Sequence, residues 1–368
     1  MIVQGAVLRE MGLPQPYAES RPLRIEQVEL ADPGPGELLV RVRAAGLCHS
    51  DLSVIDGSRP RVMPMLLGHE ATGEVVWSES PEFAPGDTVG FAFVPACGVC
   101  GPCAEGRAAL CEPGAAANTA GTLLGGPRRL DGVHHHLGVS GFADHAVVSA
   151  RSAVKIDPSL PPEIAALFGC AVLTGVGAVV NTARVQAGQS AVVFGLGGVG
   201  LSALLGAVLV GAHPIVAVDV VPEKLRLAES LGATVAIDAR GNSPVDAVRE
   251  ATVGGAYYAF ETVGSAAVLE QAYAATRRGG TTVTVGLPHP SQTLSIPAVS
   301  LVAEERTLKG SYLGSAVPSR DIPRYIALYR AGRLPVDRLL SSTVSLDRLN
   351  EAFDELAAGT SIRQVLVL

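Results

Sequence analysis

Six cysteines give this chain the means to bind metal, and their spacing divides them into two sets. Four form a C-x-x-C-x-x-C-x7-C run, made by Cys97, Cys100, Cys103 and Cys111. Short C-x-x-C spacings let the backbone aim successive sulfurs at one ion, so this run predicts a closed zinc site that braces the fold. Cys48 and Cys170 can share a second metal with His69, which would leave one coordination position open for chemistry.

Disulfide bonds are the competing interpretation of the four-cysteine run. Cysteines two residues apart pair mainly in redox motifs, and several thiols in a cytosolic chain more often hold zinc. Residues 1–10 lack the basic start, apolar run and small-residue cleavage site of a secretory signal. We therefore expect two zinc ions per chain and a cytoplasmic location.

A second chemical pattern is the glycine-rich segment Gly195 to Gly200, which matches G-x-G-x-x-G between an apolar run and a helical pattern. In a dinucleotide site Gly195 would allow the tight turn, Gly197 the approach of the pyrophosphate, and Gly200 close packing of helix on strand. The helix that begins near Gly198 and Val199 would point its free amides at the diphosphate. A purely structural glycine turn is the alternative.

Asp219, at the end of the next apolar run, indicates which dinucleotide would bind. Its carboxylate can accept hydrogen bonds from both ribose hydroxyls and would repel a 2′-phosphate. Val220 and Val221 offer no cation to offset that repulsion. The sequence therefore favours NAD over NADP.

The elements that must position these residues differ between the two parts of the chain. Residues 1–170 carry short alternating runs such as 38–42 and 73–76, which predict a β-rich domain. From about Thr174, strand and helix patterns alternate, which predicts a parallel sheet covered on both faces. The expected strands are 191–194, 215–218, 234–237, 258–261 and 282–285, and the expected helices are 199–210, 223–231, 244–252 and 266–276. Beyond Lys309 we expect a strand at 311–313, a helix at 320–330 and a strand at 364–368.

Length and charge narrow the class of protein. The chain has 368 residues, which favours two domains, and a net charge of -7, which argues against nucleic-acid or anionic-membrane partners. Residues 190–218 contain no Asp, Glu, Lys or Arg and could span a bilayer by length. Glycines interrupt that run repeatedly, so a buried strand, turn and helix explain it better.

Taken together, these features make the chain resemble the zinc-dependent medium-chain alcohol dehydrogenases over essentially its whole length. The motifs that carry the resemblance are Cys48-His49-Ser50-Asp51, Gly68-His69-Glu70, the four-cysteine run, Gly169-Cys170, the glycine-rich segment with Asp219, and Ser361-Ile362-Arg363. The resemblance implies an α/β protein with a GroES-like β-rich catalytic domain, residues 1–173 with 314–368, whose structural zinc lobe lies at about 95–113. It implies a Rossmann doubly wound parallel-sheet cofactor domain at 174–313 and a homodimer or homotetramer built through these cofactor domains.

The resemblance also implies roles for single residues. Cys48, His69 and Cys170 would bind the catalytic zinc, Asp51 would orient His69, and Glu70 would approach the metal during ligand exchange. The implied cofactor contacts outside the glycine-rich segment are His49, Thr174, Asp219, Lys224 and Arg363.

Ser50 would accept the proton of an alcohol, unless its hydroxyl only satisfies the backbone. Ser53 stands where relatives often end the proton relay with histidine, so the relay would end in water, in the cofactor ribose or at His49.

Phe93 is expected in the substrate pocket, whereas Met63, Met65 and Phe91 could equally be core residues. Arg59 could recruit an anionic substrate at the pocket rim or be a solvated surface residue.

Three consecutive histidines, His134, His135 and His136, suggest a further metal site. Successive side chains of a strand point to opposite faces, so the three cannot meet one ion. We expect them to serve the structure instead.

The leading hypothesis is an enzyme that transfers hydride reversibly between an alcohol and NAD, giving an aldehyde or ketone. Within the same family, the alternatives are an S-(hydroxymethyl)thiol (formaldehyde) dehydrogenase and a specialised reductase of enals or iminium ions. A noncatalytic dinucleotide-binding protein is the alternative outside enzymes, but it would have no need of an open metal position.

Overall fold

The computed structural model describes residues 1–241 and 243–368, which form two compact units. The first unit contains Met1–Cys170, Val317–Ala327 and Val336–Leu368. The second contains Ala171–Ala316 and Leu328–Pro335. Cysteines and histidines of both predicted metal sites belong to the first unit, and the glycine-rich segment belongs to the second.

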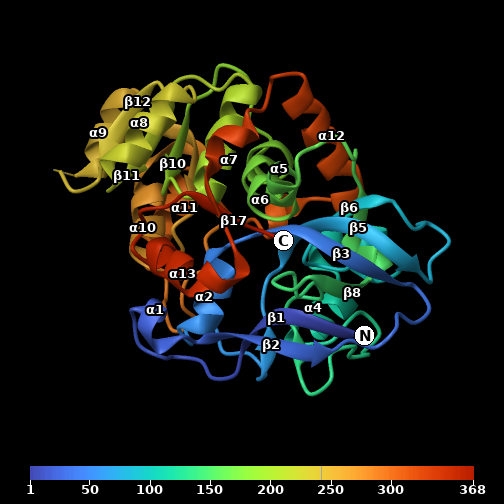
Figure 1. The fold of residues 1–368 in the computed structure, drawn as a ribbon. Coiled ribbons are helices and arrows are strands. Elements are labelled where there is room, and N and C mark those ends of the chain that lie inside the picture. The colour runs from blue at the N-terminus through green and yellow to red at the C-terminus, as the bar shows by residue number, and fades with distance from the viewer. Residues whose placement is uncertain (242) are drawn as a thin grey trace. The chain divides into compact units, whose positions relative to one another are not determined.

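Two β-sheets form the first unit (Figure 1). One has the strand order β2-β1-β4-β7, and the larger has the order β16-β17-β3-β5-β6-β9 with β8 paired to β3. The strands are β1 Ile2–Leu8, β2 Leu23–Glu29, β3 Glu37–Gly46, β4 Met65–Leu66, β5 Glu70–Ser78, β6 Thr88–Phe91, β7 His134–His135, β8 His145–Ser149, β9 Ala153–Lys155, β16 Leu340–Val344 and β17 Arg363–Val367. The helices that begin in this unit are α1 Tyr17–Ser20, α2 His49–Ile55, α3 Gly101–Ala104, α4 Glu112–Ala120, α5 Pro162–Ala165, α12 Pro318–Arg330 and α13 Leu349–Ala357.

Strand β3 shows why the larger sheet forms. Val40 and Val42 are buried while Arg41 and Arg43 are exposed, which is the alternation of a strand with one face on a core. Strand β3 pairs antiparallel with β5, so that Gly46 lies opposite Glu70. It also pairs with β17, which brings Val365 opposite Gly46. Three segments that are distant in sequence therefore meet where β3 ends, a place that we call the corner of the larger sheet.

The second unit is a six-stranded sheet with the order β12-β11-β10-β13-β14-β15, and each neighbouring pair is parallel. The predicted doubly wound parallel sheet is confirmed. Its strands are β10 Ala191–Phe194, β11 Ile215–Asp219, β12 Val235–Asp238, β13 Ala256–Glu261, β14 Thr276–Thr284 and β15 Thr307–Gly310. The α-helices that begin in this unit are α6 Ala171–Gly177, α7 Gly198–Leu209, α8 Pro222–Ser230, α9 Pro244–Ala251, α10 Ala266–Ala275 and α11 Ala298–Ala303.

One predicted strand is wrong. The chain is extended at β15, and the following segment Leu313–Ser315 is a 3-10 turn in which Gly314 has φ 65°. The last strand of this sheet, β15, instead lies earlier in the chain, where Thr307 aligns with Thr281 of β14. The turn is set by this glycine conformation, which apolar patterning does not report.

The uncharged run 190–218 folds as β10, α7 and most of β11, as the sequence predicts. Within residues 1–241 and 243–368, no single helix is both long and apolar enough to cross a membrane. One pair of successive helices, Pro162–Gly169 and Ala171–Ala183, meets those criteria only when the two are combined.

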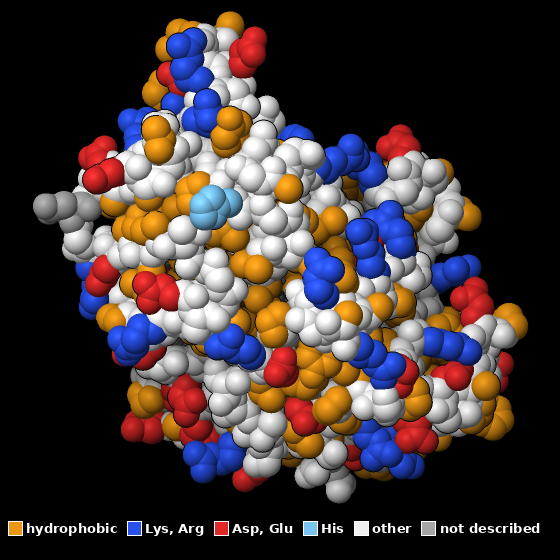
Figure 2. All heavy atoms as spheres, turned by 90° about the horizontal axis from the view of Figure 1, so that it is seen from above, with side chains coloured by type: hydrophobic (Ala, Val, Ile, Leu, Met, Phe, Trp, Pro, Cys, Tyr) orange, Lys and Arg blue, Asp and Glu red, His pale blue; other side chains and the backbone are white. Residues whose placement is uncertain are grey.

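On the face seen in Figure 2, acidic and basic side chains are interspersed, so neither sign of charge dominates there.

Candidate metal and dinucleotide sites

Two thiols, an imidazole and a carboxylate converge at the corner of the larger sheet in the first unit. The ligand atoms of Cys48, His69, Glu70 and Cys170 all lie within 4.8 Å of one another, and all four residues are buried. Cys48 caps the N-terminus of α2, just beyond β3, and His69 directly precedes β5. The pairing of Gly46 with Glu70 therefore brings these two residues together.

Two glycines allow the close approach of the backbone at this corner. Gly68 has φ +90°, and a Cβ there would lie 2.5 Å from the amide nitrogen of Phe142. A Cβ on Gly169 would lie 2.1 Å from the carbonyl oxygen of Phe91. Only glycine fits such positions. Gly68 and Gly169 therefore determine where the backbone places the next residues, His69 and Cys170.

His69 is held by contacts on several sides. Its Nδ1 lies 3.1 Å from Asp51 Oδ2, and Phe93 meets its ring edge-on with centroids 5.5 Å apart. Its Nε2 is buried and has no hydrogen-bond partner among the described residues. A buried unsatisfied nitrogen costs about 1–3 kcal/mol, and here it accompanies two sulfurs. This donor set of two sulfurs and one imidazole nitrogen fits a zinc ion.

Electrostatics at the corner favour anionic ligands. A hydrogen bond from Cys170 lowers the pKa of Cys48 well below its usual range, and the same bond together with burial raises the pKa of Cys170. Burial disfavours the charged form of Asp51, but His69 and His136 outweigh it and hold the pKa of Asp51 below its ordinary value. One thiolate and one carboxylate are therefore preformed in this unit, and thiolate is the form that binds metal.

Glu70 forms a buried ion pair with Arg363, whose side chain is 4% exposed. Burial works against the charge of Arg363, but Glu70 and the two thiols raise the pKa of its guanidinium. The pair places a carboxylate and a guanidinium beside the two thiols. Arg363 itself faces Glu70 inside the first unit.

Helix α2 carries the predicted relay residues. His49, its first residue, is exposed, and Ser50 is half-buried. The Ser53 hydroxyl donates to the His49 carbonyl oxygen over 2.7 Å, a bond inside the helix that occupies its proton. Arg59 is half-buried and donates its amide to the Ser53 carbonyl at 2.8 Å.

The expected pocket residues divide by burial. Phe93 is 8% exposed and contacts His69, as described above. Phe91 and Met65 are core residues of the first unit, and Met63 packs partly buried against the same core. Of this group, Phe93 is the side chain that touches the metal corner through an observed ring contact.

The four-cysteine run also converges, with its sulfurs within 4.8 Å of one another. Backbone amides point at these sulfurs, since Cys97 N lies 3.2 Å from Cys111 Sγ and Cys100 N lies 3.3 Å from Cys97 Sγ. Amides of Val99 and Cys100 lower the pKa of Cys97 to about 6. All six cysteines are free thiols, so the disulfide interpretation is wrong. The run could hold a zinc ion with four sulfurs.

The glycine-rich turn has the geometry of a dinucleotide site. Gly195 has φ +89°, and a Cβ on Gly200 would lie 1.8 Å from the Gly195 carbonyl oxygen. Gly197 faces space with no atom within 4 Å of an added Cβ, which leaves room for a diphosphate at the start of α7. Asp219 accepts hydrogen bonds from Leu196 N at 2.6 Å and Val221 N at 2.9 Å.

The two remaining predicted cofactor residues of this unit lie on helices. Thr174 is buried in α6, and Lys224 is half-buried on α8, the helix that follows Asp219.

Sequence reasoning missed the position of one histidine. His136 Nδ1 lies 3.1 Å from Asp51 Oδ1, and its ring meets that of His69 at 88° with centroids 5.4 Å apart. His135 instead accepts a hydrogen bond from the Arg129 amide at 3.0 Å. No spacing in the sequence links His136 to Asp51, because the pairing of β4 with β7, which aligns Leu66 with His135, is a long-range contact.

Two families of known proteins match the chain. Residues 34–158 match "Alcohol dehydrogenase GroES-like domain", and residues 198–331 match "Zinc-binding dehydrogenase". A geraniol dehydrogenase of Castellaniella defragrans is 38% identical, over 99% of this chain and 97% of that protein. The structure of benzyl alcohol dehydrogenase from Acinetobacter calcoaceticus superposes with TM-score 0.94 at 32% identity, covering 100% of this chain and 99% of the other. An alcohol dehydrogenase zinc-binding domain protein from Burkholderia ambifaria gives TM-score 0.93 at 37% identity, with the same coverage.

Proposed function

The chain belongs to the zinc-binding medium-chain alcohol dehydrogenase family, and we propose that it transfers hydride between a primary alcohol and NAD. The observation that carries the proposal is the unpartnered His69 Nε2 beside the sulfurs of Cys48 and Cys170. We assign these three residues to a catalytic zinc with one open position. We assign Cys97, Cys100, Cys103 and Cys111 to a structural zinc.

Bound in this way, zinc would polarise the alcohol or carbonyl oxygen, and NAD would accept or return the hydride. The residues of α2 handle the proton. Ser50 accepts it from the substrate hydroxyl, because this serine follows Cys48 by two residues and its helix presents it half-buried. Ser53 takes no part, since its own proton is bonded to a backbone carbonyl. The proton then leaves through His49, the exposed first residue of the helix, or through water.

The cofactor proposal rests on the charge of Asp219. Its carboxylate is fixed by two backbone amides, so its negative charge stays where a 2′-phosphate would otherwise lie. This favours NAD over NADP. The further cofactor contacts that we propose are His49, Thr174, Lys224 and Arg363. The guanidinium of Arg363 is also paired with the Glu70 carboxylate.

For the substrate, we propose a primary alcohol whose carbinol carbon is bonded directly to an alkene or aromatic carbon. Geraniol and benzyl alcohol, named for two relatives, share that chemistry. The aromatic ring of Phe93 beside His69 supports an apolar, planar substituent. Arg59 stays the candidate for a polar substituent at the rim.

A substrate panel tests this function. Purified protein would be mixed with NAD and with geraniol, benzyl alcohol, ethanol, or formaldehyde plus glutathione, while the absorbance of NADH is followed. We expect kcat/KM for the first two to exceed that for ethanol by about 10-fold or more, from apolar contacts alone. A response to formaldehyde plus glutathione only would favour the hydroxymethyl-thiol reaction. No response from protein that holds two zinc ions would favour a noncatalytic role.

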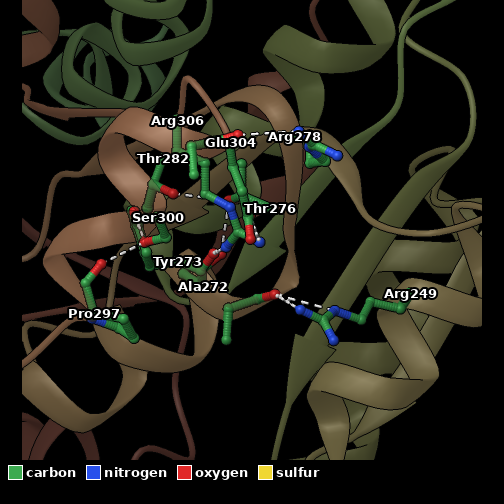
Figure 3. A network of polar contacts seen from close by, with 12 residues as sticks. Arg249, Ala272, Tyr273, Thr276, Arg278, Thr282, Pro297, Ser300, Glu304 and Arg306 are labelled. Carbon is green, nitrogen blue, oxygen red and sulfur yellow. Dashed lines mark hydrogen bonds and ion pairs between the residues drawn. The ribbon is translucent and has the colours of Figure 1, made fainter.

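We propose a homodimer built through the second unit. Strand β15 lies at the end of the sheet order, and on the neighbouring helix α11 Val299 is 71% and Val302 82% exposed. An open strand edge beside exposed apolar side chains suits a two-fold interface. Figure 3 shows how α11 is braced, since Tyr273 Oη bonds Ser300 Oγ at 2.6 Å.

Sedimentation velocity tests the dimer. The double substitution Val299→Glu and Val302→Glu should shift the protein from dimer to monomer, because it places charge in the apolar contact. Val253→Glu is the matched control, since Val253 is 93% exposed in the same unit but does not belong to α11. An unchanged dimer in the double variant would contradict the assignment.

Finally, six reduced cysteines support the expected cytoplasmic location.

A further inference from the structure

We propose that His136 is a positioning residue for the catalytic metal site, acting through Asp51 to fix the orientation of His69. The inference rests on the proposed function in one respect, namely that Cys48, His69 and Cys170 bind the metal. It adds to that site a residue of the three-histidine run, for which the sequence indicated only a structural role.

Asp51 is the point at which three separate segments meet. Its carboxylate is fully buried, accepts from the Gly68 amide at 3.1 Å and from His69 Nδ1 at 3.2 Å, and lies 3.1 Å from His136 Nδ1 as an ion pair. The three groups around it come from two other places in the fold: the loop before β5 supplies Gly68 and His69, and the residue directly after β7 is His136. No water can replace a lost donor without opening this interior, because Asp51 and His69 are both 0% exposed.

His136 is itself held rigidly. Its amide donates to Ser140 Oγ at 3.1 Å, and the Ser140 amide returns a hydrogen bond to the His136 carbonyl at 3.2 Å. Leu137 and Ser140 adopt φ of 50° and 55°, which closes a tight turn directly after the histidine. The imidazole of His136 is 1% exposed and so has one fixed place against Asp51.

The geometry explains why a second imidazole matters. A carboxylate with a single side-chain partner can rotate about its Cβ–Cγ bond, whereas one that accepts from an imidazole and an amide and pairs with a second imidazole cannot do so without losing one of these contacts. The fixed carboxylate in turn fixes the plane of His69, and thereby the direction of Nε2. The edge of the His136 ring against His69 supports the same orientation. Such partners of metal ligands typically change metal affinity by about 10–100-fold.

Asp51, His69 and His136 are also close enough together to form a metal site of their own. That alternative conflicts with the catalytic assignment, because His69 Nδ1 must carry a proton for Asp51 when Nε2 serves as the ligand. We therefore interpret the cluster as a hydrogen-bonded chain that ends at the metal.

Zinc release from the holoenzyme tests the proposal. His136→Phe keeps an aromatic ring but removes the donor, and we expect the catalytic zinc to be lost to a chelator about 10–100-fold faster. The structural zinc should leave at its wild-type rate, which separates an effect on the site from general loosening. His136→Asn keeps an amide nitrogen near the position of Nδ1 and should restore slow release. In cobalt-substituted enzyme, the visible absorption band of the catalytic site should change in His136→Phe and return in His136→Asn.

His135→Asn is the matched control, because His135 is equally buried beside His136 but bonds the Arg129 amide rather than Asp51. If His136→Phe does not fold, Ser140→Ala offers a second test, since it removes the acceptor that holds the His136 amide; the same hydroxyl also lies 3.4 Å from His135 Nδ1, a contact that the His135→Asn control covers. Wild-type release of the catalytic zinc in His136→Phe or Ser140→Ala, equal acceleration for both zinc ions, or failure of His136→Asn to restore slow release would each overturn the proposal. If the wild-type protein holds one zinc, the proposed function fails instead.

Discussion

The main-chain amide of Leu196 donates to the Asp219 carboxylate over 2.6 Å. This bond joins the turn at the end of β10 to the residue at the end of β11. A single bond thus couples the two features that we propose for the diphosphate and the ribose. It also fixes the charge of Asp219 at the carboxyl ends of parallel strands, where such sheets bind ligands.

Asp219→Asn should weaken discrimination against NADP. The substitution removes the negative charge and keeps a side-chain acceptor for one amide, so the ratio of kcat/KM for NAD to that for NADP should fall about 10-fold or more. Asp238→Asn is the control, because Asp238 occupies the register position opposite Asp219 on β12 and pairs with Arg240. A ratio that changes equally in both variants would show that Asp219 does not select the cofactor.

Two alanine substitutions in the glycine-rich turn should have opposite consequences. Gly200→Ala should lower the melting temperature without any cofactor, because its Cβ would lie 1.8 Å from a carbonyl oxygen. Gly197→Ala should leave the melting temperature of the cofactor-free protein nearly unchanged, since nothing lies within 4 Å of the added carbon. Its affinity for NADH, measured by fluorescence titration, should nevertheless fall. Unchanged affinity would place the diphosphate elsewhere.

Ser50→Ala should lower kcat by about 10²–10⁴-fold, the usual contribution of a positioned proton acceptor. Zinc content and NADH affinity should stay at wild-type values, because Ser50 belongs to neither proposed contact set. Ser53→Ala is the matched variant one helical turn away, and it should lose little activity since its hydroxyl bonds a backbone carbonyl. Steady-state kinetics with benzyl alcohol would measure kcat for both variants. A larger loss of kcat in Ser53→Ala than in Ser50→Ala would contradict the assignment of Ser50 as the proton acceptor.

The stability of the first unit should depend on pH through His135. Burial lowers the pKa of His135 from 6.5 to about 3. Between these values the unfolded chain binds the additional proton, so the contribution is fully present above pH 6.5 and is lost as pH falls toward 3. The slope approaches about 1.4 kcal/mol per pH unit.

Urea unfolding across this pH range provides the measurement. His135→Asn should flatten the dependence, whereas His289→Asn, at an exposed histidine, should leave it as in the wild type. A slope that is equally steep without His135 would show that this residue does not cause it.

The sequence alone predicted much of the second unit, and the reason is local. Each parallel strand is a short apolar run followed by a helical pattern, so the predicted 191–194 strand coincides with β10 and the predicted 199–210 helix lies within one residue of α7. The strand expected at 311–313 failed because a glycine turn, rather than side-chain pattern, decides that segment.

The metal corner shows what sequence reasoning could not provide. The sequence motifs identified Cys48, His69 and Cys170 as candidate ligands. They did not predict that Gly46 pairs with Glu70, the long-range strand register that brings these segments together. The same holds for the contact of Arg363 with Glu70 and that of His136 with Asp51. Strand register depends on the whole sheet, and nothing in the immediate neighbourhood of these residues encodes it.

The central claim is that Cys48, His69 and Cys170 hold a zinc ion with one position left for substrate. Elemental analysis combined with anomalous diffraction at the zinc edge tests this most directly. We predict two zinc ions per chain, one among the four sulfurs of the cysteine run and one bonded to these three side chains at about 2.0–2.3 Å. A single anomalous peak at the cysteine run, with nothing between Cys48, His69 and Cys170, would contradict the account.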